Sequence, residues 1–320
     1  MKSALFLIFL MLFHMKTHAS PSPDFATFDL KARNGERLTV AFIGGSLTWG
    51  ARASDPQKTS YRALIGQKLE DAYPGAHFKF LDAAIGGTGS QLGVFRLQRD
   101  VLAHKPDLVF LDFTLNDNAD ITTPDTLAAY ESLVRRIIGE GNCPVVQMFL
   151  AAKLMVEAGT TDKMARYHAN RKIVEAYSTG EGDAITLMQN RWKAGELDLD
   201  KVWPPEAFDV THPYDPGYAL YAEAGWAGFQ KAVADKLVCR VPEKMVYGNA
   251  YMNWKRVRLS SLPSLPQGWR TTFASRDYCA FDFLMSRWLD DVTVASNFVA
   301  TDRSRTRSAP PAEVLRLKFT

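Results

Sequence analysis

The clearest chemical signal in the chain is a serine in a glycine-rich turn. The segment Gly44-Gly45-Ser46-Leu47-Thr48-Trp49-Gly50 follows an apolar run over residues 38–43. Its glycines do not fit a phosphate-binding loop, because Ala51 stands where a P-loop needs lysine, and Ser46 where a dinucleotide fingerprint needs glycine. A serine on a tight strand-to-helix turn can act as a nucleophile, although a serine that only caps a helix would show the same pattern.

A nucleophilic serine needs a base, and His212 is the histidine placed to supply one. Among the histidines outside the amino-terminal segment, it alone has an acid at short, turn-compatible spacing in a loop-like setting, in Asp209-Val210-Thr211-His212-Pro213. Asp209 would accept from one ring nitrogen and leave the other free to take the serine proton. By itself this spacing is more often a solvated turn pair, so the assignment depends on the other residues.

Acyl transfer also needs hydrogen-bond donors for the developing oxyanion. Asn116 follows the apolar run 108–113, and the glycine-rich segment 86–89 follows the run 77–81. The side-chain amide of Asn116, or an unobstructed backbone N–H in the segment 86–89, could donate a hydrogen bond to the oxyanion. Each taken singly is also explained by an ordinary turn or loop.

The elements that must position these residues alternate along the chain. Apolar runs predict strands, amphipathic runs predict helices, and Pro and Gly mark their ends. The predicted strands are 38–43, 77–81, 108–113, 144–150 and 184–188, and the predicted helices are 60–72, 90–103, 124–139, 162–178 and 216–237. Mostly apolar strands between helices indicate a parallel sheet covered on both faces, with the site beyond the carboxyl ends of the strands.

In this order the four blocks resemble the SGNH hydrolase (GDSL-like esterase) superfamily, named for its Ser, Gly, Asn and His. Ser46 matches the nucleophile block, Gly87 the glycine block (Gly86 being the less favoured registration), Asn116 the asparagine block, and Asp209 with His212 the last block. Two positions depart from the family pattern. Gly45 replaces the usual aspartate before the serine, and Thr114 replaces the glycine two places before the asparagine.

The resemblance implies a flavodoxin-like three-layer α/β/α sandwich with Ser46, Asp209 and His212 as catalytic residues. The oxyanion donors would be Ser46, Gly87 and Asn116, and no metal or cofactor is expected. The Gly-Gly-Ser-x-Thr form resembles the carbohydrate-directed branch, so the expected substrate is an O-acetylated oligo- or polysaccharide. Trp49 could stack on a sugar ring, or pack against the sheet edge. A lysophospholipase, thioesterase or polysaccharide O-acetyltransferase of the same fold, and a non-catalytic carbohydrate-binding protein, stay open as alternatives.

The amino terminus has the pattern of a cleavable secretory signal. Lys2 precedes the apolar run 4–13, and Thr17-His18-Ala19 offers small residues for cleavage after Ala19. The apolar run of ten residues covers about half of a roughly 30 Å hydrocarbon core, so stable membrane insertion is not expected. We therefore expect a secreted or periplasmic protein with a signal at 1–19, a catalytic domain at 20–240 and a β-rich or irregular extension at 241–320.

Charge and cysteine content limit the classes of partner. The net charge is +3 over 320 residues, which is too small to indicate a nucleic-acid partner. It divides into +2 for residues 1–19, −4 for residues 20–240 and +5 for residues 241–320. After export, Cys143, Cys239 and Cys279 could form one disulfide, or stay as buried thiols. The oligomeric state does not follow from the sequence.

Overall fold

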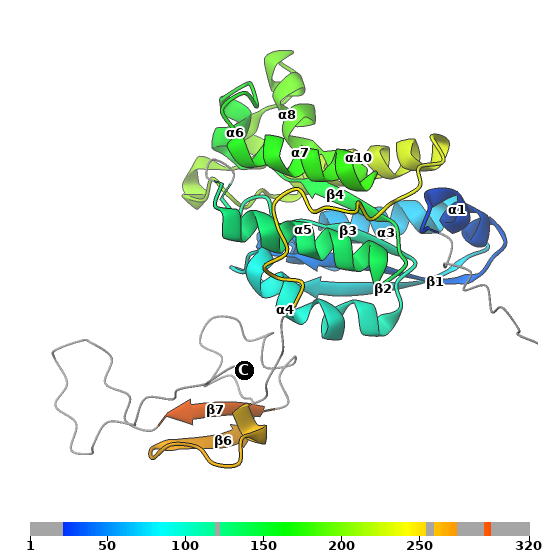
Figure 1. Ribbon diagram of the computed structural model, residues 1–320. Helices are drawn as coiled ribbons and strands as arrows, with labels where there is room; N and C mark the ends of the chain where they lie inside the picture. Colours follow the sequence, from blue (N-terminus) through cyan, green and yellow to red (C-terminus); the bar gives the residue numbers. More distant parts are fainter. Residues whose placement is uncertain (1–21, 119–121, 254–258, 274–290, 296–320) are drawn as a thin grey trace, which may run out of the picture.

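A five-stranded parallel sheet forms the centre of the protein (Figure 1), in the order β2-β1-β3-β4-β5. This is a computed structural model, and it describes residues 22–118, 122–253, 259–273 and 291–295. The strands are β1 (Arg37–Gly44), β2 (His77–Ala84), β3 (Leu108–Leu111), β4 (Val145–Phe149) and β5 (Gly180–Asp183). This strand order is that of flavodoxin-like folds and confirms the predicted class.

Helices cover both faces of the sheet. Contacts between elements group α1 (Phe25–Arg33), α3 (Tyr61–Ala72) and α10 (Asp215–Ala234) together. A second group consists of α4 (Ser90–Asp100), α5 (Pro124–Gly139) and α7 (Ala165–Tyr177). Both faces of β3 and β4 are therefore buried, which explains why these strands are apolar at nearly every position. The other described α-helices are α2 (Ser46–Trp49), α6 (Lys153–Glu157), α8 (Ala184–Lys193) and α9 (Leu199–Val202).

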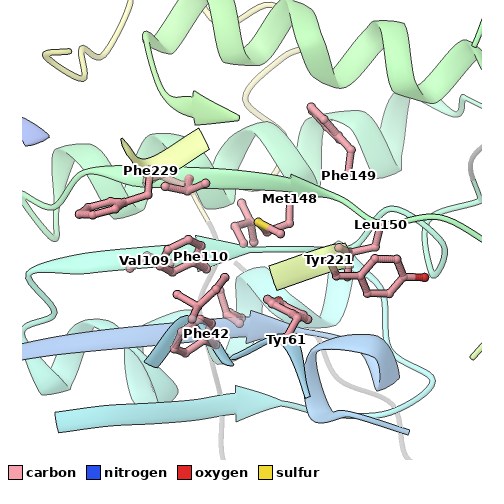
Figure 2. Packing of buried hydrophobic residues seen from close by; sticks show 14 of the residues in the cluster. Phe42, Tyr61, Val109, Phe110, Met148, Phe149, Leu150, Tyr221 and Phe229 are labelled. Atoms are coloured by element: carbon pink, nitrogen blue, oxygen red, sulfur yellow. The ribbon is translucent and has the colours of Figure 1, made fainter. Parts of the chain in front are cut away.

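Aromatic side chains pack between the sheet and the helices α3 and α10 that cover one of its faces (Figure 2). Phe42 of β1 stacks on Phe110 of β3 with ring centroids 5.0 Å apart, and Tyr61 of α3 meets Phe42 edge-on at 6.2 Å. Since all three side chains are at most 1% exposed, the contact fixes α3 against the strands that carry the site.

The last strand differs from its prediction. Residues 184–188 begin helix α8, and the strand lies just before them, at Gly180–Asp183. Its sequence, Gly-Glu-Gly-Asp, has no apolar pattern because α10 approaches it closely. A Cβ on Gly182 would lie 2.8 Å from the Cα of Gly225 in α10. Asp183 then caps α8 by accepting from the Thr186 amide at 2.9 Å.

The other predicted elements are present with ends shifted by a few residues, whereas the described helices α1, α2, α6, α8 and α9 were not predicted as helices. Helix α1 begins at Phe25, behind Asp24, whose carboxylate accepts from the Thr27 amide at 2.5 Å. Within the described ranges, no helix is long and apolar enough to cross a membrane. Cys143 and Cys239 are buried free thiols, and Cys279 lies outside the described residues, as does the predicted signal at 1–19.

The chain beyond residue 240 first runs along the α5 side of the body. Glu131 of α5 is fully buried, and its carboxylate accepts from the amides of Val246 at 2.7 Å and Tyr247 at 2.6 Å, and from the Tyr177 hydroxyl at 2.8 Å. The Tyr251 hydroxyl donates to Asp125 at 2.8 Å. Further along, β6 (Trp269–Phe273) pairs antiparallel with β7 (Asp291–Ala295), in agreement with a β-rich extension.

Candidate active site

The loops after β1, β2 and β3 meet at one edge of the sheet. Gly44 at the end of β1 pairs in register with Ala84 of β2, and Ile43 pairs with Leu111 of β3. Because the strand order reverses between β1 and β3, the loops after these two strands diverge to opposite faces and leave room for a ligand. Ser46, Gly87 and Asn116 each lie two to five residues beyond a strand end at this edge.

Ser46, His212 and Asp209 form a continuous hydrogen-bonded chain. The Ser46 hydroxyl lies 2.7 Å from Nε2 of His212, and Nδ1 of the same ring lies 2.9 Å from Oδ2 of Asp209. The serine is 166 positions from the histidine along the chain, so only the fold brings them together. The geometry lets His212 take the serine proton while Asp209 holds the ring in one tautomer.

The Asp209 carboxylate is held in its ionised form. Its second oxygen, Oδ1, accepts from the backbone amides of Thr211 at 2.9 Å and His212 at 3.0 Å. Partial burial raises the pKa of this carboxyl, but hydrogen bonds from the amide and ring of His212 and from the amide of Thr211 outweigh it and lower the pKa to about 2. Nε of Arg52 also lies 3.4 Å from Oδ2, a contact that sequence reasoning did not identify.

Ser46 sits at the first position of a single helical turn, α2. Its two ends are glycines, and the amides of Trp49 and Gly50 close the turn onto the carbonyls of Gly45 at 3.1 Å and Ser46 at 3.0 Å. Gly50 has φ 97°, a left-handed conformation that L side chains rarely adopt, which ends the helix. The side chain of Ser46 is consequently held at the tip of a tight turn.

Asn116 explains why a glycine precedes the serine. A Cβ on Gly45 would lie 1.9 Å from Oδ1 of Asn116 and 3.4 Å from its Nδ2. The amide therefore rests on the bare Cα of Gly45 with its nitrogen pointing away from it. The family pattern has aspartate at the position of Gly45, and here the missing side chain leaves the space that the Asn116 amide occupies.

The glycine loop is tied to the asparagine loop through Asp117. Gly87 has φ 69°, so a glycine is favoured there, and the residue is exposed at the sheet edge. Asp117, next to Asn116, accepts from the Ser90 amide at 2.8 Å, and a Cβ on Gly89 would lie 2.5 Å from the same oxygen. This contact fixes the distance between the Gly87 and Asn116 loops.

A buried carboxyl beneath the nucleophile turn was also missed in the sequence. Asp112, which follows β3 and is 1% exposed, lies 3.4 Å from the Thr48 hydroxyl, and this hydroxyl pairs with that of Tyr61 at 2.9 Å. Burial raises the pKa of Asp112 to about 6 despite hydrogen bonds from Thr114. Through Thr48 this group packs against the turn that carries Ser46.

Trp49 is half-buried beside the serine, and its role in substrate binding stays a prediction. Across the described ranges, no group of three or more His, Cys, Asp or Glu residues could hold a metal ion.

The fold and the four blocks agree with the comparison to known proteins. Residues 42–220, more than half of the chain, match the GDSL-like Lipase/Acylhydrolase family. The chain belongs to this family. The family is one of hydrolases of carboxylic esters, which confirms the class of enzyme inferred from the sequence.

Two relatives give the comparison more detail. An acetylxylan esterase of Geobacillus stearothermophilus is 25% identical over 211 residues, which are 61% of this chain and 94% of the relative. A two-domain esterase active on acetylated mannans, crystallised with mannopentaose, is similar with 27% identity and a TM-score of 0.65. That match covers 79% of this chain and 64% of the other. Another structure of a two-domain esterase active on acetylated mannans matches at 28% identity with a TM-score of 0.56, and there this chain spans 52% of the other's length.

Proposed function

We propose that the protein is an exported serine esterase that removes O-acetyl groups from carbohydrate through an acyl-enzyme. The observation that carries the proposal is the hydrogen-bonded chain from Ser46 through His212 to Asp209, with distances of 2.7 and 2.9 Å. Acyl transfer by a serine requires a nucleophile that is hydrogen-bonded to a base, and a base that is in turn hydrogen-bonded to an orienting acid.

In the first half of the reaction, His212 takes the Ser46 proton as the serine oxygen attacks the ester carbonyl. The backbone N–H groups of Ser46 and Gly87 and the side-chain amide of Asn116 donate hydrogen bonds to the carbonyl oxygen and stabilise the negative charge that develops on it. His212 then gives its proton to the departing sugar hydroxyl. In the second half, His212 removes a proton from water and the resulting hydroxide attacks the acetyl carbonyl. The bond from that carbon to Oγ of Ser46 breaks, acetate leaves, and His212 returns the proton to Ser46.

Two observations favour acetylated carbohydrate as the substrate. The relatives described above are, by their descriptions, an acetylxylan esterase and esterases active on acetylated mannans. Asn116 and Gly87 are exposed, and Ser46 is half-buried, so the site is open to solvent and can admit a bulky leaving alcohol. A long acyl chain would instead need an enclosed apolar channel.

Labelling and acetate release test the proposal together. A fluorophosphonate probe is expected to form an adduct on Ser46 in the folded protein, and acetate should be released from acetylated mannan or xylan. Ser46→Ala should abolish both while keeping the thermal transition. Absence of an adduct would favour a non-catalytic binding protein, and a preference for long acyl chains over p-nitrophenyl acetate would favour a lysophospholipase or thioesterase. Appearance of acetate on a second sugar rather than in solution would favour a transferase.

Export rests on the sequence of residues 1–19. We propose that the segment is removed after Ala19, because its charged start, apolar centre and small residues form a secretory signal. Mass determination of the mature protein from the culture medium or periplasm checks the cleavage site.

A further inference from the structure

One large apolar side chain stands almost entirely in solvent beside the triad. Phe208 is 95% exposed, whereas the next most exposed large apolar residue of the described chain, Leu154, is 64% exposed. It directly precedes Asp209, and Val210 on the other side is 45% exposed. Phe208 also has φ 50°, an uncommon conformation for a bulky residue, and one that costs about 1–3 kcal/mol. Folding alone gains nothing from this arrangement.

The backbone on both sides of Phe208 is rigidly held. Its amide donates to the carbonyl of Pro205 at 3.2 Å, at the end of a single 3-10 turn, and Asp209 closes the following turn through its carboxylate. The carbonyl of Val210 accepts from the Lys153 amide at 2.8 Å. An aromatic ring presented from a fixed backbone loses little conformational entropy when a ligand binds to it.

Arg52 reaches the same segment from the loop after the nucleophile. Its Nη2 donates to the carbonyl of Ala207 at 3.5 Å, and its Nε lies 3.4 Å from the Asp209 carboxylate. The guanidinium therefore bridges the two neighbours of Phe208 while the side chain stays 43% exposed. Arg52 is itself held in a left-handed conformation, φ 71°, within a loop whose Ser54 amide donates to Asp215 at 2.8 Å.

We propose that Phe208 and Arg52 form a sugar-binding subsite for the unit next to the one whose ester is cleaved. The ring offers a flat apolar face for the C–H face of a pyranose, and the guanidinium offers N–H donors to hydroxyl oxygens at its edge. A fatty acyl chain fits the arrangement less well, since it would leave most of its surface in water on an open platform beside a cation. The subsite rests on the proposed function, because it assigns the leaving alcohol of that reaction to a carbohydrate chain.

Two readouts test the subsite separately from the reaction. In the Ser46→Ala background, Phe208→Ala should weaken binding of mannopentaose or xylopentaose by about tenfold in calorimetry, and Phe208→Trp should restore it. In the active enzyme, Phe208→Ala should raise KM for acetylated oligosaccharides about tenfold more than for p-nitrophenyl acetate. Leu30→Ala is the matched control, because Leu30 is 59% exposed on the distant helix α1.

The outcomes separate the subsite from the proposed function. Equal losses on the small ester and the oligosaccharide, or oligosaccharide binding that does not depend on Phe208, would overturn the subsite while leaving the esterase. Loss of acetate release from all acetylated glycans, with Phe208-dependent binding retained, would overturn the proposed substrate but support the subsite. Sedimentation with phosphatidylglycerol vesicles that is abolished by Phe208→Ala would assign the ring to a lipid surface and refute the sugar subsite.

Discussion

Gly45→Ala adds one methyl group at the point where the nucleophile turn meets Asn116. The new Cβ would lie 1.9 Å from Oδ1 of Asn116, whereas real Cβ contacts are essentially never under 3.0 Å, so the amide has to move by about 1 Å or more. Gly45 has φ −96°, which is not the left-handed conformation that favours glycine, so the collision is the main effect. A displacement of about 1 Å can cost about 100-fold in rate, and losing one oxyanion donor costs about 100- to 1000-fold in kcat.

The assay is steady-state hydrolysis of p-nitrophenyl acetate by a set of variants. Gly45→Ala and Asn116→Ala should each lower kcat by about 100-fold or more. The double variant should lose no more than Asn116→Ala alone, because the added methyl then has no amide to displace. Gly139→Ala is the control, since its Cβ would meet nothing closer than 3.5 Å. Wild-type kcat in Gly45→Ala, or losses that multiply in the double variant, would refute the placement of Asn116 as a donor seated on Gly45.

Three further predictions concern titratable groups. Asp209→Asn should lower kcat by about 10⁴-fold and His212→Ala by about 10⁶-fold, since the acid orients the ring but the base moves the proton. Burial raises the pKa of Asp112 from 3.8 to about 6, so the native state holds this proton more tightly than the unfolded chain. The free energy of unfolding should therefore fall by about 3 kcal/mol as pH rises from about 3 to about 7, and Asp112→Asn should remove this fall in urea titrations. Burial also raises the pKa of the Cys239 thiol to about 11 and raises the pKa of the Cys143 thiol well above its ordinary value, so neither should react with iodoacetamide at pH 8 until the protein is unfolded.

Contrary results would be specific. Equal losses in Asp209→Asn and His212→Ala would mean that the carboxylate does more than orient the ring. An unchanged pH dependence of unfolding in Asp112→Asn would place the proton uptake elsewhere. Peptide mapping that finds either cysteine alkylated in the native protein would contradict the buried environment of the thiols.

The fold was predictable where burial and composition agree. The strands 38–43, 108–113 and 144–150 were visible as apolar runs because the sheet buries nearly all of their residues, whereas residues 77–81 were visible although their side chains are half-buried or exposed. The strand Gly180–Asp183 was not predicted, because its glycines allow the close approach of α10 and it has no run of apolar residues. A tertiary contact of this kind leaves no local period in the sequence.

For the site, the residue types were predictable but their supports were not. Ser46, His212 and Asp209 follow from chemistry and order along the chain, and the structure brings their side chains into contact. Arg52 and Asp112 carry no motif, because their relevance lies in contacts with residues 157 and 64 positions away. A signal was present only for Gly45, whose departure from the family pattern marked the position where Asn116 is seated.

The contacts of Glu131 bear on where the chain can be shortened. Its carboxylate is fully buried on α5, and two of its three hydrogen bonds come from the amides of Val246 and Tyr247. A protein that stops at residue 240 would keep Ser46, Asp209 and His212 and yet lose both of these amide donors to Glu131, and each lost hydrogen bond costs about 1 kcal/mol. Residues 242–251 therefore pack against the hydrolase domain as part of it. A protein expressed with these residues should be more stable than one that ends at residue 240.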